Sequence, residues 1–230
     1  MRLFVSVLAV MLVVSCQASA PDSDKAALSD AATLQGGQLV GMLEDPFQRT
    51  HMDVNLSAKG LFSVNGTLDN VRANGLSNYK VNKGDFAIVG LKANVSLTWD
   101  DISIMTKYNV KGTLIDSIPF FGNGNLSVVI KGLTVTVDLK LGVKDKKVYV
   151  TDLVLHAHIK QFPCKITGLF DDEGISNTMS QVITEVTPGL LDDYQNKISA
   201  YASPKVADLL NKLLKNYTLK DLMEIISGKQ

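Results

Sequence analysis

The stretch "TVTVDLKLGVKDKKVYVTDLVLHAHIK", residues Thr134–Lys160, alternates apolar and polar side chains through most of its length. Alternation with a period of two predicts β-strands that bury one face and expose the other. The eleven residues Leu133–Val143 keep their apolar side chains at odd positions, and "KDKK" at Lys144–Lys147 predicts a turn. Eleven residues extend about 36 Å at ~3.3 Å per residue, roughly twice a common strand length. Antiparallel strands of this length predict a sheet that coils.

Changes of phase interrupt the alternation and predict β-bulges, at which a strand bends and twists more strongly. One change falls near Gly132, and another falls at Thr151–Asp152. Further upstream, residues 91–114 change from odd to even numbers across Asp100-Asp101, so this acidic pair predicts a turn. The Gly- and Asn-rich segment Pro119–Asn125 predicts a loop.

Helical periodicity follows the strands. From Ile175 to Tyr201 the apolar residues recur at spacings of three and four, and Pro188 predicts a kink or the start of a second segment. Ser203-Pro204 predicts the start of another helix, and Thr218–Asp221 resembles a capping box that opens a last short one. A weaker helical pattern precedes the strands at Lys25–Leu43. This order predicts an α+β fold in which a long, strongly curved antiparallel sheet wraps around a long C-terminal helix.

The first twenty residues predict a secretory signal peptide. A short positive region is followed by apolar Leu3–Val14, and Ala18–Ala20 resembles a small-residue cleavage site. A rival interpretation takes "VVSC" as the lipidation box of a bacterial lipoprotein, with Cys16 as the lipidated residue. We expect a signal peptide at residues 1–20 and a single domain at residues 21–230. No other apolar run is long enough for a transmembrane anchor.

Charge and cysteine content narrow the function classes. The chain has 23 basic and 23 acidic residues, and loss of the signal peptide removes only Arg2, which leaves a net charge of −1. A chain this neutral is not built to neutralise phosphates, which argues against nucleic-acid binding, and no polybasic stretch marks it for anionic membranes. Cys164 is then the only cysteine, so no internal disulfide is expected. It is expected to be buried, or to join two chains in a dimer.

Five Asn-X-Ser/Thr sequons agree with passage through the secretory path. They lie at Asn55, Asn65, Asn94, Asn125 and Asn216. The first four fall on the polar phase of their expected strands. We therefore expect them to point outward and to carry glycans in a secreted, extracellular protein.

Three short motifs resemble those of the insect takeout and haemolymph juvenile-hormone-binding family. "DPF" (Asp45–Phe47) is similar to that family's turn after its first helix, "GLSNYKV" (Gly75–Val81) to its strand opening, and "PKVADLLNKLL" (Pro204–Leu214) to its closing helix. Mite group-7 allergens are similar too. The resemblance implies a TULIP-like lipid-binding domain, half of a BPI-type super-roll, with an apolar tunnel. The takeout family usually has an N-terminal cysteine pair and a second bridge, which this chain lacks, so both the hormone-binding and the group-7-allergen branch stay open.

Motifs for catalysis are absent from the sequence. It contains no Gly-X-Ser-X-Gly elbow and no phosphate-binding loop, and we expect neither an enzyme nor a cofactor. His156 and His158 share one face of a strand, as metal ligands do, but by phase this face points outward. Two exposed histidines are the favoured interpretation, and no metal site is expected.

The remaining hypothesis is a secreted carrier that binds a small hydrophobic ligand, such as a fatty acid or a juvenile hormone-like terpenoid, in the internal tunnel. The alternative is an interaction or immune-type protein that binds microbial lipids at an exposed tip. For any single apolar residue, packing in an ordinary core is the more common role. The prediction of a ligand site therefore rests on the curved sheet and its helix, and not on any one residue. Trp99, Tyr108 and Tyr194 are expected to add polar tips to it. The expected lining is Val95, Leu97, Trp99, Ile104, Tyr108, Val135, Val137, Met179, Val182, Ile183, Val186, Leu190 and Tyr194.

Secretion predicts a processed, glycosylated protein. The mature chain should begin within a few residues of Pro21 and lose mass when an N-glycosidase removes its glycans. N-terminal sequencing, together with mass spectrometry before and after the enzyme, measures both properties. A chain that keeps Met1 and does not change mass would contradict the secreted location.

Overall fold

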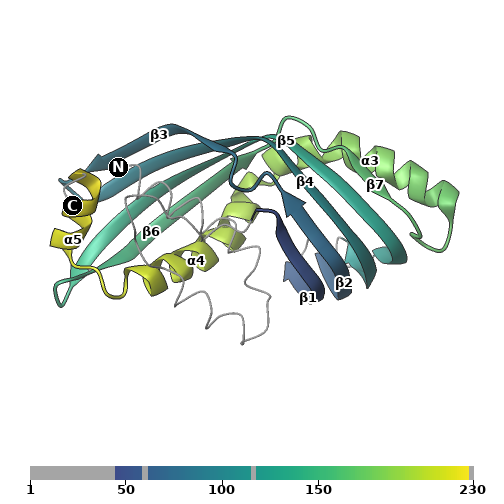
Figure 1. The fold of residues 1–230 in the computed structure, drawn as a ribbon, viewed down its shortest axis with the longest axis horizontal. Coiled ribbons are helices and arrows are strands. Elements are labelled where there is room, and N and C mark those ends of the chain that lie inside the picture. The colour runs from purple at the N-terminus through teal and green to yellow at the C-terminus, as the bar shows by residue number, and fades with distance from the viewer. Residues whose placement is uncertain (1–44, 59–61, 115–117, 228–230) are drawn as a thin grey trace.

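The structure, a computed structural model, describes residues 45–58, 62–114 and 118–227, so the expected signal peptide and the Lys25–Leu43 helix lie outside it. Strands come first in the described chain and helices last (Figure 1). The strands are β1 (Phe47–Ala58), β2 (Phe62–Asn74), β3 (Tyr79–Ala87), β4 (Lys92–Leu114), β5 (Ile118–Lys144), β6 (Lys147–His158) and β7 (Cys164–Ile166). The helices are α3 (Glu173–Asp193), α4 (Gln195–Leu214) and α5 (Leu219–Ser227).

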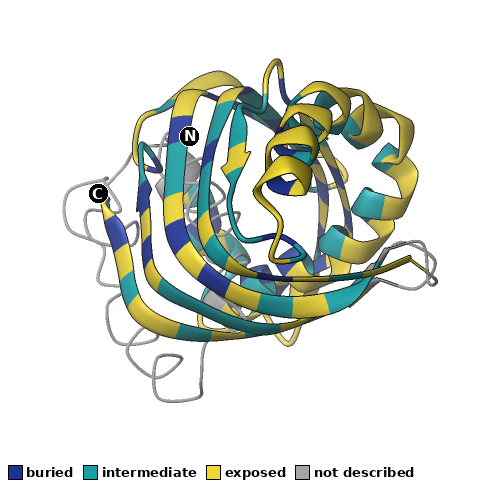
Figure 2. Cartoon of the chain, turned by 90° about the vertical axis from the view of Figure 1, so that its right-hand side faces the viewer, coloured by how far each residue is buried: buried dark blue, intermediate teal, exposed yellow. Residues whose placement is uncertain are grey.

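The strands form one antiparallel sheet. Its order is β1-β2-β4-β5-β6, with β3 paired to β4 and β7 paired to β5. β4 has 23 residues and β5 has 27, and the predicted turn at Lys144–Lys147 joins β5 to β6. Figure 2 shows how these long strands curl around one side of the molecule. The predicted α+β class, a long and strongly curved antiparallel sheet with C-terminal helices, is confirmed.

Two predicted interruptions of the long strands are wrong. Asp100-Asp101 does not turn the chain, because β4 continues through it and only its partner changes, from β3 to β2. Pro119–Asn125 is not a loop but the first part of β5, paired with β4. The glycines in this segment serve close packing, since a Cβ at Gly122 would lie 2.7 Å from the Tyr108 hydroxyl oxygen.

The bulge predicted at Thr151–Asp152 is confirmed. Asp152 pairs with Lys140 and Val150 pairs with Leu141, which leaves Thr151 as the extra residue. The valines before the bulge and the leucines after it are therefore buried on the same side of the sheet, although their numbers change parity.

A second change of phase occurs where the buried residues of both long strands change from odd to even numbers, between Trp99 and Ile102 in β4 and between Val135 and Val128 in β5. Gly132 has a φ of 62°, a backbone conformation that favours glycine. The register continues unbroken past it, because Trp99 pairs with Leu133 and Asp101 pairs with Lys131. The β4–β5 ladder is thus one continuous element with a bend at this point.

The helices begin and end at residues other than those predicted. The break in the helical run falls at Tyr194, while Pro188 lies inside α3 and Pro204 lies inside α4. The capping box of α5 is confirmed. The Thr218 N–H donates to Asp221 Oδ2 at 2.8 Å, and the Asp221 N–H donates to Thr218 Oγ1 at 3.2 Å.

Helices α3 and α4 cover the edge of the sheet that β6 and β7 form (Figure 1). An edge strand leaves a row of N–H groups unpaired, and buried N–H groups need acceptors. Side-chain oxygens of α4 accept from β6. The bonds are Val150 N–H to Asn211 Oδ1 at 2.7 Å, Leu155 N–H to Ser203 Oγ at 3.2 Å, and Ala157 N–H to Gln195 Oε1 at 2.8 Å.

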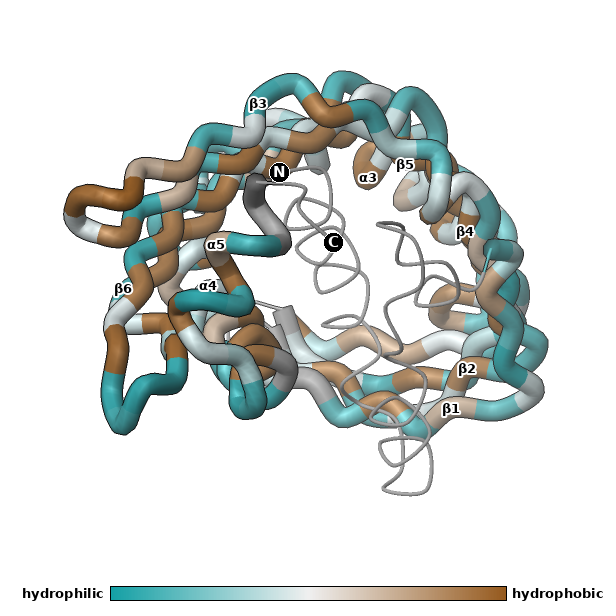
Figure 3. Tube along the Cα trace, turned by 60° about the vertical axis from the view of Figure 1, so that its left-hand side comes forward, coloured by the Kyte–Doolittle hydropathy of each residue, from teal (hydrophilic) through white to brown (hydrophobic). Residues whose placement is uncertain are grey.

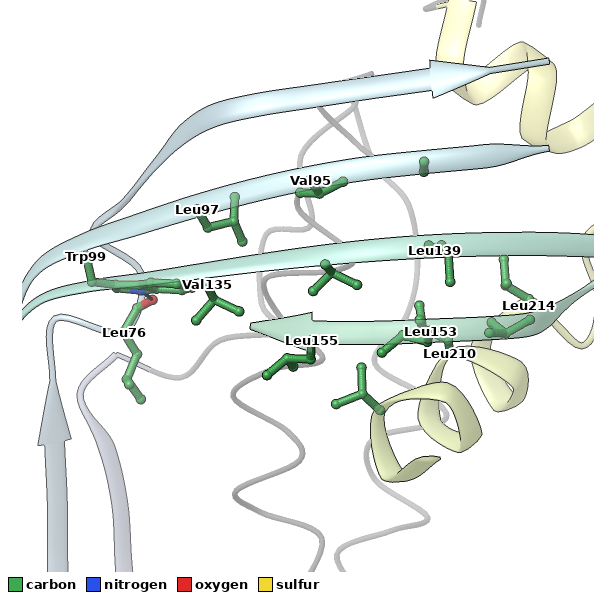
Figure 4. Packing of buried hydrophobic residues seen from close by; sticks show 14 of the residues in the cluster. Leu76, Val95, Leu97, Trp99, Val135, Leu139, Leu153, Leu155, Leu210 and Leu214 are labelled. Atoms are coloured by element: carbon green, nitrogen blue, oxygen red, sulfur yellow. Dashed lines mark hydrogen bonds between the residues drawn. The ribbon is translucent and has the colours of Figure 1, made fainter. Parts of the chain in front are cut away.

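The main hydrophobic core lies between the sheet and α4, where Leu210 lies beside Leu153 (Figure 4). We call the face of the sheet that carries these buried residues the inner face, and the opposite one the outer face. The Trp99 side chain is 1% exposed, and its Nε1–H donates to the Leu76 carbonyl oxygen at 2.8 Å.

The "DPF" and "GLSN" motifs contact each other. Asp45 Oδ1 accepts from the Gly75 N–H at 2.9 Å, and Asp45 Oδ2 accepts from the Ser77 N–H at 2.9 Å and from the Ser77 hydroxyl. Partial burial acts to raise the pKa of the Asp45 carboxyl, but the bonds from Ser77 and Gly75 outweigh it and hold this pKa below its usual value. The motifs therefore fix the start of β1 to the turn before β3, and Leu76 within that turn accepts from Trp99.

Replacing Ser203 with Ala should lower the free energy of unfolding by about 1–3 kcal/mol, because the buried Leu155 N–H loses its acceptor. Chemical denaturation measures the change. Asn196→Ala, at an exposed position of the same helix, is the control and should stay within about 0.5 kcal/mol of the wild type. Equal effects of the two substitutions would show that the edge bond does not stabilise the fold.

Candidate functional site

Helix α3 carries three different lines of residues. Small hydroxyl residues recur every four positions at Ser176, Ser180 and Thr184. Polar residues recur in the same way at Asn177, Gln181 and Glu185. Apolar residues form the third line, on the other side of the hydroxyl line. We call this third line the apolar flank of α3, and its members are Ile175, Met179, Val182, Ile183, Val186 and Leu190, continued by Tyr194.

The hydroxyl line attaches α3 to β7 and to the residues that follow it. Ser176 Oγ accepts from the Leu169 N–H, Ser180 Oγ from the Ile166 N–H, and Thr184 Oγ1 from the Cys164 N–H, each at 2.9 Å. Each hydroxyl also donates to the helix carbonyl four residues earlier, at 2.7 Å. The side of α3 that meets the sheet is therefore polar, which the helical periodicity did not predict.

The polar line of α3 lies on the outer side of the sheet. His158 belongs to the outer face of β6, because its neighbours Ala157 and Ile159 have the opposite orientation and Ile159 is buried. The His158 Nδ1 lies 2.9 Å from Asp192 Oδ1 at the end of α3. Since the hydroxyl line separates the two other lines, the apolar flank lies on the inner side.

The apolar flank is largely uncovered. Ile175, Val182, Val186, Leu190 and Tyr194 keep between 37% and 48% of their surface exposed. Met179 and Ile183, which lie nearer to the hydroxyl line, are half-buried. A helix that buried its apolar side in an ordinary core would show values near those of Val206 and Leu210 in α4, which are 1% exposed.

Half-buried apolar side chains also occupy the inner face of the sheet in the half that carries α3. In this half the even-numbered residues of β4 and β5 point inward, as buried Tyr108 and Val128 show. The half-buried members are Leu68, Ile104, Leu126 and Ile130. The sequence had predicted only Ile104 as a ligand-lining residue. Leu68, Leu126 and Ile130 were already recognisable as apolar members of their strands.

The structure divides the predicted ligand-lining residues into two groups. Val95, Leu97, Trp99, Val135 and Val137 are at most 5% exposed and belong to the core that α4 and α5 complete. The α3 residues are not members of that buried cluster, and its helical members are Val206, Leu210, Leu214 and Leu222. A ligand-lining role for both groups together stays a prediction. Ile104 is half-buried and packs against this core, and the geometry favours the α3 residues as the lining.

Two of the three expected polar tips are already bonded to the protein. Trp99 Nε1 donates to Leu76, and the Tyr108 hydroxyl donates to the Thr167 carbonyl oxygen at 2.7 Å. Tyr194 lies at the break between α3 and α4, with 37% of its surface exposed and the Lys197 Nζ 5.1 Å from its ring centre. Tyr194 is thus the one of the three whose side chain is exposed.

Residues considered for chemistry or cross-linking lie apart from this flank. His156 and His158 are exposed on the outer face, and the described residues contain no group of three or more potential metal-binding side chains. Cys164 is half-buried at the start of β7, and burial raises the pKa of its thiol. A dimer through Cys164 stays a prediction.

The sequon asparagines lie away from the inner face. Asn55, Asn65, Asn125 and Asn216 are exposed, while Asn94 is half-buried with its amide donating to Asp138 at 2.6 Å. A surface hollow of about 530 Å³ is lined by residues of β2, β4 and β5 together with Asp171, and these include Asn65 and Phe121. Glycosylation at the five asparagines stays a prediction.

No helix among the described residues combines the length and the hydropathy needed to cross a membrane.

Two comparisons with known proteins identify the family of the chain and a solved structure with a similar fold. A family model described as haemolymph juvenile hormone binding protein matches residues 44–224. The crystal structure of Epiphyas postvittana Takeout 1 is similar with a TM-score of 0.54 and 15% sequence identity, over 77% of this chain and 82% of that one. A crystal structure of lipopolysaccharide binding protein gives a TM-score of 0.36 and 16% identity, over 86% of this chain and 39% of that one. No curated protein sequence matches the chain.

Trp99→Phe should lower the free energy of unfolding by about 1–3 kcal/mol, because the ring is kept but the buried Leu76 carbonyl loses its donor. It should leave the uptake of an apolar probe unchanged, since the indole N–H is already used within the fold. Denaturation and probe titration measure the two effects. Loss of uptake in a stable Trp99→Phe protein would instead place the indole N–H in the ligand site.

Proposed function

The chain belongs to the haemolymph juvenile hormone binding protein family, and from this premise we propose that it is a secreted carrier for a small hydrophobic ligand. A fatty acid or a juvenile hormone-like terpenoid is the class of ligand that fits. Binding and release, without catalysis or a cofactor, would be its activity. Its exposed sequons would carry glycans outside the cell.

The observation that carries this proposal is the exposed apolar flank of α3. The flank runs from Ile175 to Leu190, about four helical turns, and lies on the inner side of the sheet. Half-buried Leu68, Ile104 and Ile130 lie on that same side. Apolar surface left uncovered costs about 25 cal/mol per Å², so an apolar guest that covers it would bind favourably.

The alternative is an interaction protein that binds lipids only at an exposed tip. It does not explain why the apolar flank of α3 is exposed. Apolar residues that run along most of the length of α3 favour a ligand lying lengthwise beside this helix. Because Trp99 and Tyr108 use their polar atoms within the protein, we expect apolar contacts to supply most of the affinity.

Val182→Trp tests the site directly. Val182 is 42% exposed, so the fold has room for the larger ring, and the free energy of unfolding should change by less than about 1 kcal/mol. The indole should occupy the space beside α3 and abolish the uptake of a fluorescent fatty-acid analogue by delipidated protein. Val154→Trp, at a 37% exposed apolar residue on the outer face of β6, is the matched control and should bind like the wild type.

Either of two results would contradict the carrier. One is a delipidated wild-type protein that takes up no apolar probe, and the other is a Val182→Trp protein that binds as well as the wild type. If Val182→Trp destabilises the protein by roughly 1–3 kcal/mol or more, the flank is packed core. Mass spectrometry of an organic extract of the purified protein would identify the natural ligand.

A further inference from the structure

The turn between β3 and β4 presents apolar side chains to solvent. Val89 is 91% exposed and Ile88 is 61% exposed, which are the highest values among the large hydrophobic residues of the described chain. The turn is held by a hydrogen bond from the Leu91 N–H to the Ile88 carbonyl oxygen at 3.2 Å. Its shape is therefore fixed with both side chains pointing outward, and Figure 3 shows it as a hydrophobic projection at the left of the molecule.

A second turn, between β5 and β6, lies at the same end of the molecule. Figure 1 shows the end of β3, the start of β6 and α5 together at the left. The Leu141 N–H donates to the Leu91 carbonyl oxygen at 2.8 Å, so β5 lies beside β4 up to the β3–β4 turn. The β5–β6 hairpin then extends a few residues further, to its turn at Lys144–Lys147. We call residues 88–92 and 144–147 together the tip.

The tip is basic as well as apolar. Its charged residues are Lys92, Lys144, Lys146 and Lys147 against Asp145, and all five are exposed. The neighbouring α5 adds charges of both signs, with Lys220 Nζ 3.7 Å from Glu224 Oε1. The chain as a whole is neutral and has no polybasic stretch, so it is folding that brings these lysines to one end beside Ile88 and Val89.

We propose that the tip docks on the surface of anionic phospholipid membranes. Ile88 and Val89 would enter the interfacial region, where apolar side chains leave water. The four lysines would meet the phosphate and carboxylate groups of the lipids around them. Exposed apolar residues with lysines at the same end of the molecule favour such an interface, since burial and charge attraction act together.

A second copy of the chain fits the tip less well. Two tips that met would bring their lysines against each other, which opposes association. A stable protein interface also buries about 800 Å² on each partner, whereas the tip is two narrow turns. A membrane is a broad, flat surface that both turns can reach at once from the same end of the molecule.

Docking by the tip does not depend on the carrier function, because none of its residues belongs to the apolar flank of α3. If the protein is a carrier and also docks by its tip, the docked protein would exchange its ligand with the membrane. The two proposals can fail separately, because vesicle binding tests the docking and probe uptake tests the carrier.

Sedimentation with lipid vesicles tests the tip. The wild-type protein should bind vesicles of phosphatidylcholine with phosphatidylserine and should bind vesicles of phosphatidylcholine alone much less. Raising the salt from about 0.1 M to about 0.5 M should release it, because charge attraction is screened over shorter distances. The double variant Ile88→Asp, Val89→Asp should bind the anionic vesicles about tenfold more weakly or less.

The double variant Met105→Asp, Ile118→Asp is the matched control. Met105 is 50% exposed on β4 in the other half of the sheet, and Ile118 is 55% exposed at the start of β5. Met105→Asp combined with Ile118→Asp therefore removes two exposed apolar side chains and adds two charges away from the tip, as Ile88→Asp, Val89→Asp does at the tip. This control should bind vesicles like the wild type. The triple variant Lys144→Gln, Lys146→Gln, Lys147→Gln should lose the preference for anionic lipid while keeping the fold, as circular dichroism will show.

Three results would overturn the docking proposal. The first is a wild-type protein that does not bind anionic vesicles, and the second is an Ile88→Asp, Val89→Asp variant that binds them as well as the wild type. The third is a wild-type dimer, seen by light scattering, that becomes a monomer in this variant. The uptake of the fluorescent fatty-acid analogue is measured on the same variants. Lost vesicle binding with normal uptake supports the tip, while failed uptake by the wild type concerns only the carrier.

Discussion

The β6–β7 edge must find acceptors for its N–H groups, and this requirement sets how the C-terminal helices lie. Oxygen atoms from Asn211, Ser203 and Gln195 of α4, and then from the hydroxyl line of α3, meet the edge in succession. The orientation of each helix on the sheet is therefore not set by its apolar periodicity alone. In α4 the need for acceptors is compatible with a hydrophobic core, because Val206 and Leu210 lie on the same side of the helix as the accepting side chains. In α3 the hydroxyls take that side, and the apolar residues are left beside it.

This difference separates α4, which meets the sheet through both burial and hydrogen bonds, from α3, which meets it through hydrogen bonds. A buried valine or leucine contributes about 1.5–3 kcal/mol, whereas a hydrogen bond contributes about 0.5–1.5 kcal/mol net. Helix α4 combines both kinds of contact, and α3 depends on Ser176, Ser180 and Thr184. A guest that covers the apolar flank would supply to α3 the burial that its docking side lacks. Binding would then stabilise this half of the protein by mass action.

Sequence patterns predicted those features that local chemistry decides. Period-two alternation gave the long strands, a change of parity gave the bulge at Thr151, and Thr218 with Asp221 gave the capping box. Turn-forming residues misled at Asp100-Asp101 and Pro119–Asn125, because pairing along the whole β4–β5 ladder outweighs local turn preference. The apolar stripe of α3 was recognised, but the side that meets the sheet was not. Ser176, Ser180 and Thr184 recur every four residues, and that spacing was the available signal.

The length of the β4–β5 ladder has a consequence for the order in which the chain can fold. The two strands follow one another, so the pair Leu114 and Ile118 closes a very short loop, while Lys92 and Lys140 close one of about fifty residues. The entropic cost of closing a loop rises with its length, so the residue pairs near the connection form most easily. Each pair that forms shortens the loop that the next pair has to close, and so lowers its entropic cost. The ladder should close from the α3 half toward the tip. The β3–β4 hairpin that carries the exposed Val89 closes a short loop of its own, at the pair Ala87 and Lys92, so it can form before β5 reaches it.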